Sequence, residues 1–96
     1  MTRALIIADI EGIIDVYDLQ DSEKCSELYT REISIYTNAL LKNNINDITI
    51  CDIHDKGDMI NPCILEMGIA CESQIQLVSR VENIRFDEKY DFAILV

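Results

Sequence analysis

Four short runs of apolar residues stand out along the chain, and each has the length of a buried strand. They cover Ala4–Ile10, Asp47–Ile53, Gln74–Arg80 and Phe92–Val96, and are rich in isoleucine, valine and leucine. Strands that alternate with polar residues face water on one side, whereas near-continuous apolar strands are covered on both faces. The pattern therefore predicts a mostly parallel sheet of about four strands.

The segment between the first two strands has the periodicity of a helix. From residue 22 to 43, apolar residues recur at intervals of three and four, forming one stripe of Tyr29, Ile33, Tyr36 and Leu40. Asn43-Asn44 follows where the periodicity stops, and asparagine tolerates the left-handed conformation that ends many helices. The sequence thus predicts one long helix from about Ser22 to Asn43.

The order strand, helix, strand makes the opening of the chain a βαβ unit. A second helix is predicted over Pro62–Cys71, because proline fits the first turn of a helix, and residues 81–90 are predicted as a loop or short helix. We therefore expect a single α/β domain over residues 1–96, a βαβ-based three-layer sandwich. Because Phe92–Val96 runs to the last residue, the sheet is expected to be truncated after its fourth strand.

Charge and composition narrow the classes of partner. Eight Lys and Arg face 18 Asp and Glu, a net charge of −10, whereas nucleic acids and anionic membranes are bound through basic residues. No run approaches the roughly 20 apolar residues of a membrane span, and the apolar run at the start is too short for a secretory signal. The four cysteines lack zinc-finger spacing. We expect a cytoplasmic protein with reduced thiols that binds neither nucleic acid nor membranes.

Acidic residues and the histidine follow the first two predicted strands. Alternation along a strand places Asp9 and Glu11 on one face, where the two carboxylates repel each other unless a cation lies between them. Gly12 allows the backbone to turn sharply away. Asp52 and His54 share a face in the same way, and a carboxylate beside an imidazole can orient it or bind metal with it. Taken singly, each motif is more typical of a solvated loop.

Position changes this interpretation, because strands joined by a βαβ crossover lie close together and ligands bind beyond their carboxyl ends. Asp9, Glu11 and His54 then supply two oxygens and one nitrogen, enough for a catalytic zinc that keeps its fourth position for water. Manganese suits the same mixed set. Such an ion lowers the pKa of bound water and polarises a carbonyl, so the implied reaction is hydrolysis.

The same residues resemble a known family. Ile7–Ile13 is similar to the S-x-D-x-E-G-I opening of the DppA-type D-aminopeptidases, family M55 of the metallopeptidases. The segment Thr30–Asn44 aligns without a gap with the T-x-E-V...G pattern of that family. Ile50–His54 stands where the family has V-N-D-S-H, although Cys51 and Ile53 replace its Asn and Ser. Residues 59–61 resemble the M-x-N that follows.

The resemblance implies a metallo-aminopeptidase with one or two zinc ions that removes N-terminal D-amino acids from short peptides, and it implies ring-shaped homo-oligomers. It implies Asp9 nearest the metals, Glu11 and His54 as further ligands, and Asp52 in a supporting role. In the family, a G-x-H-A segment follows the strand matching Phe92–Val96 and brings further ligands and a catalytic histidine. His54 is the only histidine here, so we expect no catalytic residue within this chain.

Three functions therefore remain open. The chain is either a fragment or split subunit of such a peptidase, active only with a complementing chain, or a non-catalytic metal-binding domain that serves assembly. A receiver-like signalling domain ranks last. In a receiver domain the third strand is followed by an aspartate, whereas in this chain the third predicted strand ends at Ser79-Arg80.

Overall fold

The four predicted strands form one sheet in the computed structural model, which describes residues 2–10, 22–54, 56–70, 72–84 and 89–96. All neighbouring strands are parallel, and their order is β3-β2-β1-β4. This confirms the predicted α/β class with a parallel four-stranded sheet. The strands are β1 (Arg3–Ala8), β2 (Asp47–Asp52), β3 (Gln74–Ser79) and β4 (Phe92–Leu95).

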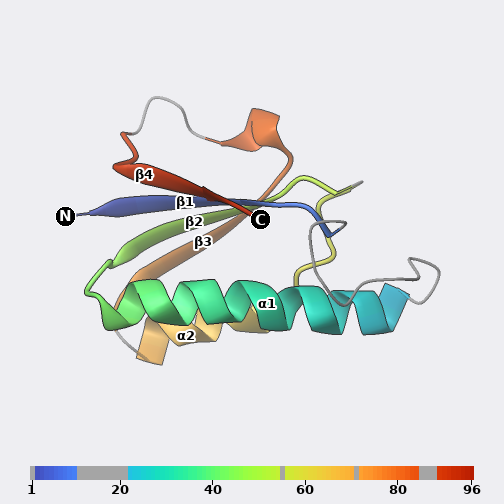
Figure 1. Ribbon diagram of the computed structural model, residues 1–96, viewed down its shortest axis with the longest axis horizontal. Coiled ribbons are helices and arrows are strands. Elements are labelled where there is room, and N and C mark those ends of the chain that lie inside the picture. The colour runs from blue at the N-terminus through green and yellow to red at the C-terminus, as the bar shows by residue number, and fades with distance from the viewer. Residues whose placement is uncertain (1, 11–21, 55, 71, 85–88) are drawn as a thin grey trace.

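Both described α-helices lie on the same face of this sheet (Figure 1). The first, α1, covers Ser22–Lys42, one residue shorter than predicted, and Asn44 has the expected left-handed conformation with φ of 61°. The predicted second helix is divided in two. Pro62–Leu65 forms a 3-10 helix, η2, which begins with the proline, and Glu66–Ala70 continues as α2.

The main core lies between the helices and the sheet. Alternate residues of the strands point to this side, and the stripe of α1 packs against them. The residues buried there include Ala4, Ile6, Ala8, Ile10, Cys25, Tyr29, Ile33, Ile48 and Ile50. The predicted helical stripe therefore faces the core, although Tyr36 is only partly buried.

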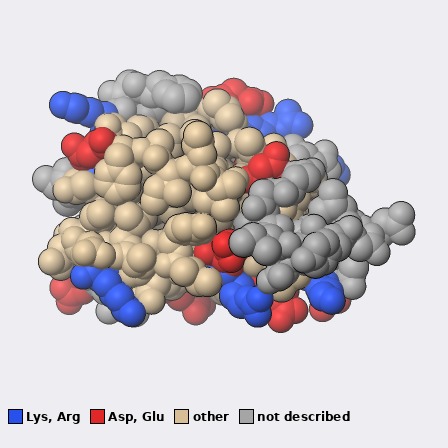
Figure 2. Space-filling view, viewed as in Figure 1, with Lys and Arg blue, Asp and Glu red and all other residues tan. Residues whose placement is uncertain are grey.

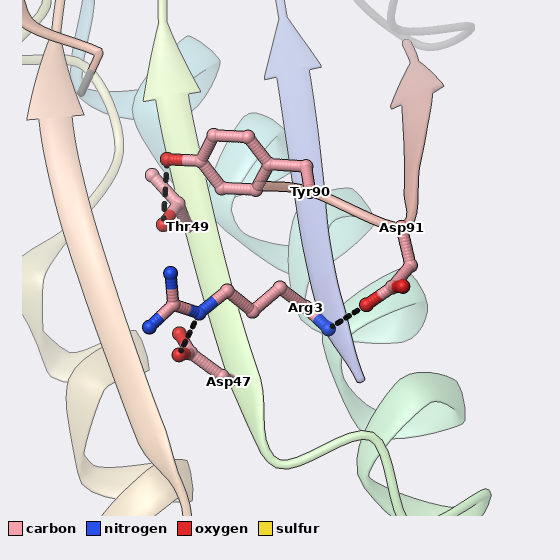
Figure 3. A network of polar contacts seen from close by, with 5 residues as sticks. All are labelled: Arg3, Asp47, Thr49, Tyr90 and Asp91. Carbon is pink, nitrogen blue, oxygen red and sulfur yellow. Dashed lines mark hydrogen bonds and ion pairs between the residues drawn. The ribbon is translucent and has the colours of Figure 1, made fainter. Parts of the chain in front are cut away.

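A smaller cluster covers the opposite face of the sheet. Leu5 and Cys51 pack there against Ile84, which follows the short 3-10 helix η3 (Val81–Asn83). Near the amino ends of the strands, Arg3 donates from its backbone N–H to Asp91 at 2.7 Å and from Nε to Asp47 at 3.0 Å (Figure 3). These contacts fix the segment preceding β4 to β1 and β2.

The end of the first strand differs from the prediction. The apolar run suggested a strand to Ile10, but β1 ends at Ala8 and Ile10 lies in a 3-10 turn with its side chain fully buried. The reason is the register, because Ala8 is paired with Asp52, the last residue of β2. Asp9 therefore lies just beyond the sheet.

Charged side chains are unevenly distributed over the face of the molecule that Figure 2 shows. A broad area without Lys, Arg, Asp or Glu lies over β4 and between it and α1 in the view of Figure 2. Within the described residues, every helix is too short or too polar to cross a membrane. In this view the charged residues lie around this area, so the surface over β4 is largely uncharged.

Candidate functional site

The strand order creates a specific place for a ligand. The helices α1 and α2, which precede β2 and β3, lie on one face of the sheet, whereas η3, between β3 and β4, lies on the other (Figure 1). The chain segments that connect the strands therefore run to opposite faces of the sheet on the two sides of the boundary between β1 and β4. In open α/β sheets, ligands bind beyond the carboxyl ends of the strands at a boundary of this kind. Asp9 follows β1 here, and its backbone N–H donates to Val96, just after β4, at 3.3 Å.

Asp9 and His54 meet at this edge. The backbone N–H of Ile53 donates to the carbonyl of Ala8 at 3.0 Å, which ties the end of β2 to the end of β1. The imidazole Nδ1 of His54 then lies 3.5 Å from Oδ1 of Asp9. Their side chains are 25% and 41% exposed, while Oδ1 of Asp9 is itself buried. The pair is therefore partly shielded but open to solvent on one side.

Asp52 organises the loop that carries His54. Its side chain is 2% exposed and accepts three hydrogen bonds of 3.0 Å, from the Tyr29 hydroxyl and from the backbone N–H groups of His54 and Met59. The sequence predicted that Asp52 supports His54. In the structure this carboxylate holds the backbone of His54, and it also anchors the loop to α1 through Tyr29.

Three further hydrogen bonds hold the same loop in place. The backbone N–H of Gly57 donates to the carbonyl of His54 at 2.8 Å, and Gly57 has a φ of 73°. The hydroxyl of Ser26 donates to the carbonyl of Met59, and the hydroxyl oxygen of Thr30 accepts from the N–H of Asn61 at 2.8 Å. The first half of α1 thus holds this loop at Met59 and Asn61.

Two buried groups near Asp52 resist ionisation. Burial, the charge of Asp52 and the hydrogen bond to it raise the pKa of Tyr29 far above its ordinary value. Burial, with the charges of Asp52 and Glu82, raises the pKa of the Cys51 thiol to about 11. Both side chains are therefore neutral at physiological pH, and Cys51 is a poor nucleophile.

We expect Cys51 to contribute to unfolding at alkaline pH. The folded state keeps the thiol protonated to about pH 11, whereas the ordinary pKa is 9.0, so the unfolded chain loses its proton first. The free energy of unfolding then falls between pH 9 and 11, by at most roughly 2–3 kcal/mol. In urea titrations at each pH, Cys51→Ala should flatten this decline, whereas Cys63→Ala at an exposed thiol should not. Equal slopes for the two variants would contradict the assignment.

The sequence-predicted site is only partly within the described structure. Asp9, Asp52 and His54 are placed together, whereas Glu11 and Gly12 lie outside the described residues. Among the residues that are described, no three His, Cys, Asp or Glu side chains gather as a potential metal site. The periodicity of the sequence places Tyr29 in the apolar stripe of α1 and does not show its hydrogen bond to Asp52. A buried tyrosine needs a partner for its hydroxyl, and this requirement was the available signal for its bond to Asp52.

Comparisons with known proteins add no relative. The chain matches no family model, and no curated protein or solved structure shows significant similarity to it. The resemblance to DppA-type D-aminopeptidases therefore rests on the motif residues alone.

Proposed function

We propose that the carboxyl edge of the sheet binds a divalent metal, zinc in the first instance, through Asp9 and His54 with Glu11 as the third ligand. We further propose that this metal site serves hydrolysis of short peptides with N-terminal D-amino acids, the activity implied by the family resemblance. The observation that carries the proposal is the approach of the Asp9 carboxylate to the His54 imidazole.

The separation of these two atoms supports metal ligation. An N–H···O hydrogen bond is typically about 2.9–3.0 Å long, and the distance here is 3.5 Å. Two ligand atoms about 2.0–2.2 Å from one tetrahedral zinc ion lie about 3.3–3.6 Å apart. The oxygen and nitrogen thus already have the spacing that a shared ion requires, on a loop that Asp52 and Tyr29 hold.

The residues of the chain have separate tasks in this proposal. Asp9 and His54 hold the ion, and the hydrogen bonds of Asp52 fix the backbone of His54. A bound ion would supply Lewis acidity toward the substrate carbonyl and would lower the pKa of a water molecule bound to it. His54 is the only histidine of the sequence and is already a proposed metal ligand. The catalytic histidine that the family resemblance implies therefore has to come from another segment or chain.

A second candidate function is a metal-binding domain that serves assembly without catalysis. It is favoured by β4, an uncharged strand that pairs on one side with β1 and has Leu95 78% exposed. Edge strands are commonly guarded by lysine or proline, and β4 contains neither. Turnover of D-alanyl-p-nitroanilide by the zinc-loaded chain with a complementing chain would separate the two functions.

We expect the purified chain to bind zinc at neutral pH, measured by isothermal titration calorimetry and by metal content after dialysis. Asp9→Ala removes one ligand and should weaken zinc binding by at least about 100-fold, because the remaining groups cannot complete the coordination. The matched control is Asp58→Asn, which removes one charge from an exposed position in the same loop and should change affinity by less than about threefold.

Two results would contradict the metal site. One is the absence of bound zinc in the unaltered chain, and the other is an equal loss of affinity in the Asp9 and Asp58 variants. The second result would mean that the ion is attracted by the general negative charge of this edge rather than bound by Asp9. Circular dichroism of each variant would establish that the fold is retained.

A further inference from the structure

A small cavity lies beyond the carboxyl ends of β2 and β3. Its volume is about 240 Å³ and it is lined by Ile53, Arg80, Val81 and Glu82. Ile53 immediately precedes His54, so the Cα atoms of the two residues are about 3.8 Å apart. One residue that lines the cavity is thus the direct chain neighbour of a proposed metal ligand.

Arg80 has an unusual backbone conformation at this position. Its φ and ψ angles are 66° and 149°, at the border of a region that is essentially restricted to glycine. Hydrogen bonds hold the residue there, since its N–H donates to the carbonyl of Asp52 at 3.0 Å and its carbonyl accepts from Asn83 at 3.2 Å. Glycine would satisfy the same bonds without strain. The backbone therefore gives no reason for a large side chain, and strain of this kind concentrates at ligand-binding positions.

The lining of the cavity has a definite chemistry. The planar guanidinium of Arg80 matches the geometry of a carboxylate. Ile53 and Val81, which are 37% and 44% exposed, supply apolar walls. Glu82 lies 3.6 Å from Nη1 of Arg80, and both side chains are more than half exposed. An exposed ion pair of this kind contributes little, so Glu82 is a weak competitor for a carboxylate ligand.

We propose that Arg80, with Ile53 and Val81, binds the carboxylate of a small apolar carboxylic acid, such as the C-terminal residue of a short peptide. Only one part of this proposal rests on the proposed peptidase function, namely that the bound carboxylate belongs to the substrate. It then names the substrate class as a peptide short enough for its free C-terminus to reach Arg80 while its N-terminal residue lies at Asp9 and His54. Binding of the carboxylate itself requires no metal.

The test is a nuclear magnetic resonance titration of the metal-free, full chain with isobutyrate, and with the neutral isobutyramide as control. We expect isobutyrate to shift the backbone amides of residues 53 and 80–82 and the side-chain N–H of Arg80, with millimolar affinity. Isobutyramide has the same shape and no charge, so it should leave the Arg80 side-chain resonance in place. Equal effects of the two compounds, or no shift with isobutyrate, would overturn the proposal.

Two variants should change the affinity in opposite directions. Arg80→Gly removes the guanidinium at a backbone position that suits glycine, so isobutyrate binding should weaken at least about tenfold without a lower melting temperature. Glu82→Gln removes the competing carboxylate and should tighten binding by about twofold to threefold. Binding by Arg80→Gly within twofold of the unaltered chain would refute the assignment. Zinc affinity, measured separately, should stay unchanged in both variants. A failure of the carboxylate site can therefore be distinguished from a failure of the metal site.

Discussion

Asp52→Ala is expected to be the most destabilising single substitution near the site. It leaves the Tyr29 hydroxyl and the N–H groups of His54 and Met59 without the carboxylate that accepts from all three. Hydrogen bonds to charged groups contribute about 1.5–3 kcal/mol each, and unsatisfied buried donors are costly. We therefore expect the free energy of unfolding in urea to fall by about 3–5 kcal/mol.

Matched variants separate the hydrogen bonds from the loss of charge. Asp58→Ala, at an exposed position in the same loop, should change stability by less than about 0.5 kcal/mol. Tyr29→Phe removes one of the three bonds and should cost about 1–2 kcal/mol. A double-mutant cycle between Tyr29→Phe and Asp52→Asn should show coupling. A loss below about 1 kcal/mol in Asp52→Ala would show that the loop does not depend on this carboxylate.

Gly57→Ala is expected to have the second largest effect. A Cβ atom on Gly57 would lie 2.5 Å from Cβ and 2.7 Å from Cα of Ser79, and 2.9 Å from the carbonyl oxygen of Asp52. The residue also has a φ of 73°, which alanine adopts only with strain. Because two of the three contacts are with backbone atoms, the loop has to move, at a cost of about 3 kcal/mol or more.

The second glycine near the sheet is a suitable control. Gly68 lies within α2. A Cβ atom added at Gly68 would lie 3.0 Å from the side chain of Ile75 and 3.0 Å from the carbonyl oxygen of Ser73. The higher helix propensity of alanine offsets this crowding, so Gly68→Ala should change stability by less than about 1 kcal/mol. Zinc titration of Gly57→Ala should also show weakened binding, since the substituted residue bonds to the carbonyl of His54. Equal stability of the two alanine variants would contradict the close contact at Ser79.

The fold was predictable because its elements have strong local patterns. The apolar stripe around Tyr29 and Ile33 is sufficient to predict α1, and near-continuous apolar runs indicate parallel strands. The end of β1 was not predictable in this way. Ile10 continues the apolar run, but strand pairing stops where Ala8 meets Asp52, and a register of this kind depends on residues far apart in sequence.

The candidate site was predictable only in part, for a similar reason. The approach of Asp9 to His54 follows from the βαβ rule and polar strand ends. The role of Tyr29 depends on its hydrogen bond to Asp52, 23 positions away in the sequence. The role proposed for Arg80 depends on its backbone conformation. Neither the bond nor the conformation leaves a periodic signal in the sequence. The strand order, which places Asp9 between β2 and β4, was equally inaccessible.

That strand order has a consequence for the way the chain folds during synthesis. Of the four described strands, β1 is made before the others and lies inside the sheet. One of its two neighbours is β4, from which it is separated by more than 80 residues. Pairing between such distant segments requires closure of a long loop and is intrinsically slow. While β4 is still inside the ribosome, one side of β1 presents unpaired peptide groups in an apolar strand, a state prone to aggregation. The nascent chain is therefore most in need of chaperone protection between the completion of β3 and the release of residues 92–95.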